Sequence, residues 1–222
     1  ARLQRAFDLL RGWVEDGTLP GASALVARRG VVVGRCCFGD AVREPERRPI
    51  GPDTLFAVAS ITKPFTATAV MQAVEQGKVD LDADVNKYLD FRIPDTYPQP
   101  ITLKHLMTHT SGIEDRWLES LTPDASELVS EREWLVENFP GRVRPPGEAA
   151  GYSNYNAMLG GYIVARVSGE PYDQYIHEHI FEPLGMTHSN VHVQIPENLR
   201  PYLSKSYTYG DGAFQSFPDY LP

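Results

Sequence analysis

Hydrophobic residues near the start of the chain recur with the spacing of an amphipathic helix. They fall three or four positions apart and stop before Gly17: Leu3, Ala6, Phe7, Leu10, Trp13 and Val14. Two runs rich in apolar and β-branched residues follow, Ser23–Arg28 and Val31–Phe38. Arg29-Gly30 between them predicts a tight hairpin turn. The pattern therefore predicts one helix and two antiparallel strands in this first part of the chain.

The pattern becomes helical further along. Thr54–Ser60 indicates a short extended segment, and Ile61–Gln76 predicts a buried helix that stops at Gly77. Pro64 fits the first turn of that helix, where its missing N–H is not needed. Capping and stop signals predict four more helices: Thr102–His109, Ser130–Asn138, Asn154–Ser168 and one that starts at Pro171. Ser130 and Glu133 have the spacing of a capping box, and Asn154 is a candidate cap for its helix.

Composition is that of a globular protein. The 222 residues are 42% hydrophobic, and no run approaches the roughly 18 apolar residues of a membrane span. The net charge of −8 argues against nucleic acid as a partner. Arg43, Arg47 and Arg48 lie among prolines and glutamates, which predicts a solvated loop. Adjacent Cys36 and Cys37 favour two thiols over a strained bridge. No signal peptide precedes Ala1, and the compartment stays open between cytoplasmic and extracytoplasmic.

Ser60 and Lys63 form an S-x-x-K sequence at the start of a predicted helix. Residues i and i+3 share one helix face, so the lysine amine is expected near the serine hydroxyl. A serine hydroxyl becomes a good nucleophile only when a neighbouring group takes its proton. Alone, the pattern is weak evidence for catalysis, because an N-capping serine followed by a solvated lysine gives the same four residues by chance. Tyr152-Ser153-Asn154, about ninety residues further on, offers a second group for proton transfer.

Three longer stretches bear on this choice: FAVASITKPFTATAVMQAVEQGKVDLD, ITLKHLMTHTSGI and RPPGEAAGYSNYNAMLGGYIVARVSGEPYDQYIHEHIFEPLGM. In their order and spacing the chain resembles the serine β-lactamase-like family, in the branch of class C β-lactamases, D-peptidases and carboxylesterases. The resemblance implies an α/β (α+β) fold of the β-lactamase/transpeptidase type. Residues 1–59 would hold a helix and a hairpin of the antiparallel sheet, residues 60–200 a mostly helical region, and residues 201–222 the start of a remainder.

The family's third motif, K-T-G or H-x-G on a strand, does not occur in the sequence. KSYTYG near Lys205 lacks the apolar pattern of such a strand. We therefore expect this chain to be the N-terminal part of one domain, with a C-terminal fragment or a second chain completing the sheet. The hairpin Ser23–Phe38 should then expose a free edge, and the chain alone should be nearly inactive.

The resemblance also implies a role for each site residue. Ser60 would attack a carbonyl and become acylated, while Lys63 and Tyr152 share the proton transfers. Asn154 would contact the substrate and hold Lys63. The cation of Lys63 would lower the pKa of the Tyr152 phenol. The oxyanion would rest on the backbone N–H of Ser60 and on a second N–H from the missing strand.

No metal or cofactor is expected. His105 and His109 have an i, i+4 spacing that can bind zinc, but no third ligand accompanies them. Trp117 and the loop Glu114–Asp124 fall where the family places a cleft wall, without a specific contact to substrate. Two functions stay open. One is a serine hydrolase acting on esters, β-lactams or small D-amino acid peptides, with esters and peptides preferred; the other is a non-catalytic binding, sensor or structural protein.

Overall fold

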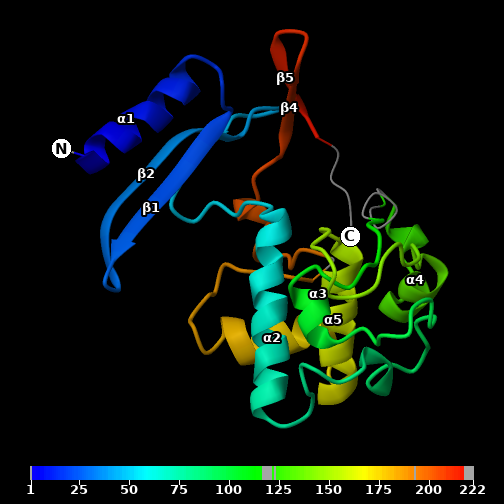
Figure 1. Cartoon of the computed structure of the whole chain (residues 1–222). Coiled ribbons are helices and arrows are strands. Elements are labelled where there is room, and N and C mark those ends of the chain that lie inside the picture. The colour runs from blue at the N-terminus through cyan, green and yellow to red at the C-terminus, as the bar shows by residue number, and fades with distance from the viewer. Residues whose placement is uncertain (1, 117–121, 123, 193, 218–222) are drawn as a thin grey trace. The chain divides into compact units, whose positions relative to one another are not determined.

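The computed structural model describes residues 2–116, 122, 124–192 and 194–217, and it contains two compact units (Figure 1). The first unit combines the described residues up to Ala57 with those from Ile195 to Phe217. The second consists of residues between Val58 and Gln194. Within the described ranges, no helix has both the length and the apolar composition that a membrane crossing requires.

The first unit is built on an antiparallel sheet of strand order β1-β2-β3, with β1 Gly21–Arg28, β2 Val31–Val42 and β3 Arg48–Pro49. The turn between β1 and β2 has positive φ at both central residues, 53° at Arg29 and 77° at Gly30. That geometry matches the right-handed twist of the flanking strands. The predicted hairpin is therefore confirmed, and its strands extend beyond the predicted limits.

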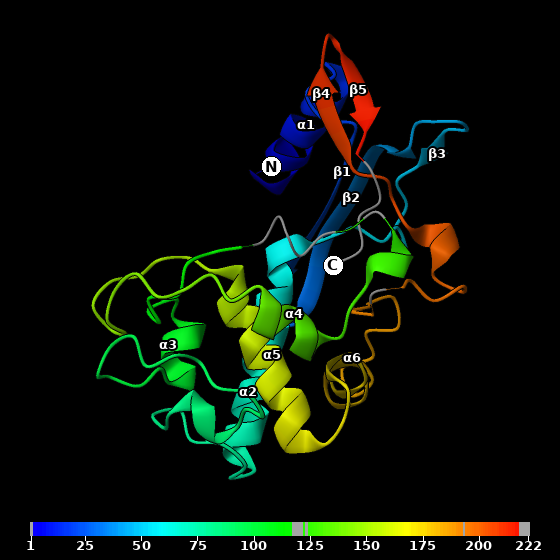
Figure 2. The ribbon, with the colours of Figure 1, turned by 90° about the vertical axis from the view of Figure 1, so that its right-hand side faces the viewer.

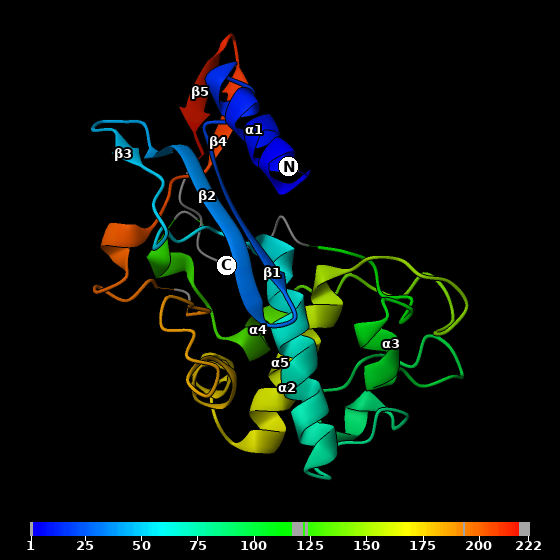
Figure 3. The same ribbon diagram turned by 90° about the vertical axis from the view of Figure 1, so that its left-hand side faces the viewer.

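Helix α1, Arg2–Glu15, lies along the β1–β2 hairpin (Figure 3). The helix approaches Gly34 of β2 so closely that a Cβ there would lie 2.7 Å from the Leu3 Cδ2 and 3.1 Å from the Phe7 ring. The Arg11 guanidinium covers the Phe38 ring at 5.1 Å. The apolar spacing of α1 thus serves to cover one face of the hairpin, as the periodicity predicts.

A second hairpin, which the sequence pattern did not predict, completes the described part of the first unit. β4 Tyr207–Gly210 pairs with β5 Ala213–Ser216 across a turn with φ of 52° at Asp211 and 77° at Gly212. The Tyr207 hydroxyl accepts a hydrogen bond from the Arg43 N–H at 2.6 Å. The last four residues of KSYTYG therefore form a strand despite their polar sequence, because a partner strand and a turn supply the pairing.

The prediction of a solvated loop around the three arginines is wrong for two of them. Arg48 belongs to β3, and its guanidinium donates to the Leu203 carbonyl. The Arg43 guanidinium lies over the Phe214 ring at 4.8 Å. Only Arg47 remains mostly exposed, paired with Asp40 at 3.4 Å. Tertiary partners from residues 203–214 replace water around the other two.

Strand β1 has β2 as its only strand neighbour among the described residues. Apolar side chains of this hairpin stay in solvent, with Leu25 62% and Val31 63% exposed. The expected free edge is therefore present in the described part of the sheet. Such an edge is a ready template for further strand pairing.

The second unit is helical, and its helices α2 and α5 pack side by side (Figures 1 and 2). Its elements are η1 Ala59–Thr62, α2 Lys63–Glu75, η2 Val85–Lys87, α3 Leu103–Met107, η4 Ala125–Glu127, α4 Glu131–Glu137, α5 Asn154–Ser168, α6 Tyr172–Ile176 and η5 His177–Phe181. The short helix η6, Arg200–Tyr202, belongs to the first unit. Apolar side chains of α5, including Leu159 and Ile163, are fully buried against α2 residues such as Val70. Burial of each such side chain contributes about 1.5–3 kcal/mol.

Local signals fix several helix ends as predicted. Thr102 and His105 form a reciprocal capping box at α3, and the Ser130 hydroxyl accepts from the Glu133 N–H at α4. Gly169 ends α5 with a φ of 83°. Three details differ from the prediction. Helix α6 starts at Tyr172, and Pro171 is its N-cap and not its first residue. Helix α3 ends at Met107, because His109 adopts a φ of 54°, and Asn154 is the first residue of α5 after the N-cap Ser153, with no capping side chain.

Candidate active site

Ser60 lies in a tight turn at the entrance to α2. The predicted extended segment ends before it, because Ala59 has a φ of 44° and begins the 3-10 helix η1. A non-glycine residue in this region costs roughly 1–2 kcal/mol. The chain then continues directly into α2 at Lys63, with Pro64 in the first turn as predicted. The turn leaves Ser60 exposed and one helical turn from Lys63.

The Ser60 hydroxyl lies between two proton-transfer groups. Its Oγ is 2.7 Å from the Tyr152 phenol oxygen, although 92 residues separate them in sequence. The Lys63 Nζ donates to the same Oγ at 3.1 Å, and it lies 4.8 Å from the centroid of the Tyr152 ring. The prediction that Lys63 and Tyr152 come within hydrogen-bond reach of Ser60 is confirmed.

Asn154 holds Lys63 from the start of α5. Its Oδ1 accepts from the Lys63 Nζ at 2.7 Å. Its backbone N–H donates to Asp115 Oδ1 at 2.7 Å, and its Nδ2 donates to Asp115 Oδ2 at 3.0 Å. The structure thus brings all four predicted residues together and adds Asp115, which the sequence did not single out.

The surroundings of the Tyr152 phenol lower its pKa. Burial acts to raise its pKa, but hydrogen bonds from Lys63 and Ser60 and the positive charge of Lys63 outweigh burial, and the pKa lies below its ordinary value. Tyr152 is 53% exposed, so reagents in solvent reach it. A phenol with a lowered pKa beside a serine hydroxyl is suited to general base catalysis.

His109 supports the Tyr152-Ser153-Asn154 segment and does not resemble a zinc ligand. Its Nδ1 accepts the Ser153 backbone N–H at 3.2 Å. Its ring stacks on Tyr152 with centroids 4.5 Å apart. His105 instead caps α3 through Thr102. The i, i+4 spacing of the two histidines therefore serves two separate structural contacts.

A profile of the Beta-lactamase family matches residues 6–221. The chain belongs to this family. Among the relatives of this beta-lactamase family member, esterase EstB of Burkholderia gladioli is 35% identical over 199 residues, which cover 84% of this chain and 50% of the esterase. The chain spans about half the length of the curated relatives it matches.

Two solved structures show the same fold. The octameric penicillin-binding protein homologue from Pyrococcus abyssi superposes with a TM-score of 0.85 at 29% identity, over 98% of this chain and 51% of that chain. D-amino acid amidase from Ochrobactrum anthropi SV3 superposes with a TM-score of 0.78 at 26% identity, over 98% and 62% of the two chains. The fold implied by the sequence resemblance is confirmed, and S-x-x-K is characteristic of this family.

A small cavity of about 50 Å³ lies behind the lysine of this beta-lactamase family site, lined by Lys63, Val70, His109, Asn156 and Gly160 among others. Ligand pockets usually measure roughly 300–1,000 Å³, so this cavity is too small to hold a substrate. Asn156 is buried and accepts from the Ser111 hydroxyl at 2.7 Å. The cavity and this bond belong to the packing that supports α5 against α2.

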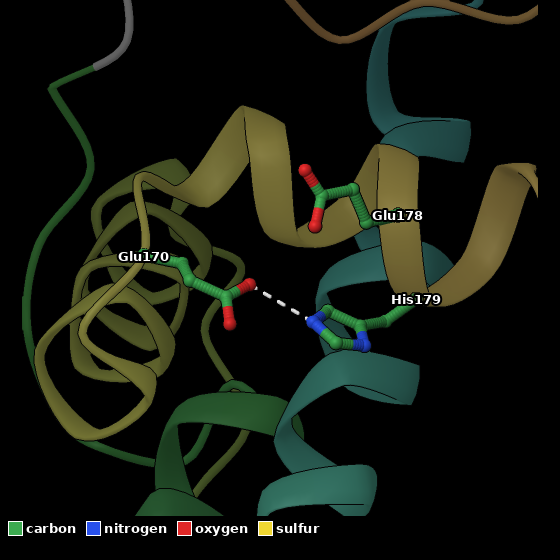
Figure 4. Close-up of side chains that lie close together, drawn as sticks. All are labelled: Glu170, Glu178 and His179. Atoms are coloured by element: carbon green, nitrogen blue, oxygen red, sulfur yellow. Dashed lines mark hydrogen bonds and ion pairs between the residues drawn. The ribbon is translucent and has the colours of Figure 1, made fainter.

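One cluster outside the site has the composition of a metal centre. Ligand atoms of Glu170, Glu178 and His179 all lie within 4.8 Å of one another (Figure 4). Each already has a protein partner: His179 Nε2 is 2.9 Å from Glu170 Oε2, and Glu178 Oε1 accepts from Gln174 Nε2 at 2.8 Å. We assign this cluster to ion pairing and hydrogen bonding along α6 and η5.

Some predicted features of the cleft fall outside the described structure. Trp117 and part of the loop Glu114–Asp124 belong to the ranges that the structure does not describe. Asp115, in the same loop, is described and contacts Asn154. No local signal marked Asp115 in the sequence, because its contact partner lies 39 residues away.

Proposed function

We propose that this chain carries the nucleophilic centre of a serine hydrolase that works through an acyl-enzyme. The observation that carries the proposal is the position of the Ser60 Oγ, 2.7 Å from the Tyr152 oxygen and 3.1 Å from the Lys63 Nζ. The distance to Tyr152 lies in the range over which a positioned base takes a proton, and Lys63 donates a hydrogen bond to the same oxygen. A lone N-capping serine would not require either contact.

The reaction would proceed in two steps. Tyr152 accepts the proton of Ser60 while the Oγ forms a bond to the substrate carbonyl carbon. The same proton then passes to the leaving alcohol or amine, and the carbon–leaving-group bond breaks to give the acyl-enzyme. In the second step Tyr152 takes a proton from water while the water oxygen forms a bond to the acyl carbon. The bond between that carbon and the Ser60 Oγ breaks, the proton passes from Tyr152 to the Oγ, and the carboxylic acid leaves. Lys63, held by Asn154, stabilises the phenolate during both steps.

We place esters and amides ahead of β-lactams as substrates. Relatives named as an esterase and as a D-amino acid amidase support this order. Comparing turnover of a p-nitrophenyl ester with that of nitrocefin by the protein tests it. A much larger kcat/KM for nitrocefin would reverse the order.

The assignment of Ser60 is tested by covalent labelling with a fluorophosphonate, followed by intact mass. Ser60→Ala should abolish labelling while the thermal transition stays nearly unchanged, because Ser60 is exposed. Ser216→Ala, an exposed serine on β5, is the matched control and should label normally. Labelling that persists in Ser60→Ala would refute the assignment. No labelling of the wild-type protein would favour a non-catalytic binding function.

We also retain the proposal that a further segment or chain completes the sheet. Loss of one oxyanion donor typically costs about 10²–10³ in kcat. Adding the polypeptide that supplies the third motif should therefore raise ester turnover by that order. Full turnover by Ala1–Pro222 alone, as a monomer, would contradict this proposal.

A further inference from the structure

Asp115 accepts two hydrogen bonds from Asn154, the first residue of α5. Its Oδ1 accepts the Asn154 backbone N–H at 2.7 Å, and its Oδ2 accepts the Asn154 side-chain Nδ2 at 3.0 Å. We infer that Asp115 is a positioning residue, which sets the orientation of the Asn154 amide and thereby the position of the Lys63 ammonium. Its catalytic consequence rests on the proposed hydrolase function, but the positioning itself does not.

Chemistry permits only one orientation of this amide. Lys63 has only donors to offer, so it requires the Asn154 oxygen. The Asp115 carboxylate has only acceptors, so it requires the Asn154 NH₂ group. A flipped amide would place two donors against each other at Lys63 and two acceptors against each other at Asp115. The carboxylate therefore removes the two-fold ambiguity of an asparagine side chain.

The orientation of the Asn154 amide matters because the Lys63 ammonium donates hydrogen bonds to both Asn154 and Ser60. Its Nζ donates to Asn154 Oδ1 at 2.7 Å and to Ser60 Oγ at 3.1 Å. The shorter contact anchors the ammonium, and the longer one reaches the nucleophile. If Asn154 turned its NH₂ group toward Lys63, the ammonium would be repelled from its anchor. A displacement of about 1 Å at a reacting group can cost on the order of 10² in rate.

A competing hypothesis gives Asp115 no role beyond its charge. The two hypotheses predict opposite shifts in the pKa of Tyr152 when Asp115 is replaced. Among the described residues, four groups face this phenol: Ser60 from η1, Lys63 from α2, His109 after α3, and Asp115. After burial, which raises the pKa of Tyr152, contacts with Lys63 and Ser60 lower it, and the charge of Asp115 raises it. Removing only a charge at Asp115 would lower this pKa further. Releasing Lys63 from its place would raise it.

The deciding experiment is an NMR titration of the protein carrying ¹³Cζ-tyrosine, with the Tyr152 signal assigned by Tyr152→Phe. Asp115→Asn keeps the size of the side chain and an oxygen for the Asn154 backbone N–H. It offers an NH₂ group where the Asn154 Nδ2 needs an acceptor. We expect the pKa of Tyr152 to move upward in Asp115→Asn. A downward movement would overturn the positioning role, because it is the response to a lost charge alone.

Glu114→Gln is the matched control, since it removes a negative charge one residue away and leaves the Asp115–Asn154 contacts in place. It should not raise the pKa of Tyr152. The exchange Asp115→Asn with Asn154→Asp rebuilds the three contacts, with donor and acceptor reversed only between the two exchanged side chains. It should bring the pKa of Tyr152 back toward the wild-type value. Failure of this exchange to reverse an upward shift would also count against positioning.

Fluorophosphonate labelling supplies a second readout. Asp115→Asn should slow labelling of Ser60 roughly 10- to 100-fold at a pH where the wild type reacts readily, while Glu114→Gln should not. The titration requires no turnover. An upward pKa shift in a protein that never labels would therefore refute the proposed function and leave the positioning role intact.

Discussion

The imidazole of His109 stacks on the phenol of Tyr152, with centroids 4.5 Å apart and planes inclined by 32°. The same imidazole accepts the Ser153 N–H through Nδ1. One ring thus supports two consecutive residues of the segment that faces Ser60. Burial, and then the charge of Lys63, lower the pKa of His109. A neutral ring is what the acceptor role of Nδ1 requires.

Acidification should therefore destabilise the protein. The folded-state pKa of His109 lies below the unfolded value of about 6.5, and burial shifts that of His105 in the same direction. The unfolded chain then binds more protons, so the stability present above about pH 6.5 declines as the pH falls below it toward the folded-state pKa. Urea unfolding between about pH 8 and pH 5 measures this slope.

His109→Asn tests which histidine is responsible. Asparagine tolerates the positive φ of this position, and it does not titrate. The slope of unfolding free energy against pH should become shallower, with the remainder due to His105. A slope that stays unchanged in His109→Asn would show that protonation of His109 does not limit stability.

Tyr152→Phe should slow the labelling of Ser60 by about 10²–10⁴, the usual contribution of a general base. The wild-type labelling rate should rise with pH and level off below about pH 10, the ordinary pKa of tyrosine, because the pKa of Tyr152 is lowered. Tyr209→Phe, a tyrosine that is 65% exposed in β4, provides the control. Equal rates in the two variants would exclude Tyr152 as the base.

Gly34→Val should destabilise the protein by about 1–3 kcal/mol, the usual cost of overpacking. A side chain at Gly34 would collide with Leu3 and Phe7 of α1. Gly12→Ala is the control within α1, where an added Cβ meets nothing within 4 Å. It should stabilise the helix by about 0.5–1 kcal/mol. Chemical denaturation measures both, and a neutral Gly34→Val would show that α1 does not pack there in solution.

Leu159→Ala should cost about 2–5 kcal/mol, because Leu159 is fully buried in the core around α5. Leu184→Ala, at a leucine that is 68% exposed, should change stability by less than about 0.5 kcal/mol. The difference between the two midpoints in urea tests whether α5 forms the core of the second unit. Similar midpoints would contradict that placement.

The sequence predicts this fold where signals are local. The turn at Arg29-Gly30 demands positive φ, and the caps at Thr102 and Ser130 bond residues only three positions away. Ser60 and Lys63 are likewise linked by helix geometry alone. The strand Tyr207–Gly210 was missed although Asp211-Gly212, a turn signal of the same kind, follows it directly.

Other features depend on contacts that no local pattern records. Asn154 fits a helix cap by position, yet its amide contacts Lys63 and Asp115, which approach from distant parts of the sequence. Arg48 lies in a charged, proline-rich stretch but meets the Leu203 carbonyl, 155 residues away. Family resemblance supplied the pairing of Ser60 with Tyr152. It did not supply Asp115 or His109 as supports.

The backbone of Leu55 donates to the Tyr202 carbonyl at 2.9 Å and accepts from the Ser204 N–H at 2.8 Å. These bonds close a loop that contains the whole of the second unit, so the first unit has contacts of very high sequence separation. Such contacts form slowly from an unfolded chain. Folding of residues 58–194 during synthesis would shorten the effective loop before residue 204 leaves the ribosome. Ser60, Lys63 and Tyr152 would then be assembled in the nascent chain before the sheet unit closes.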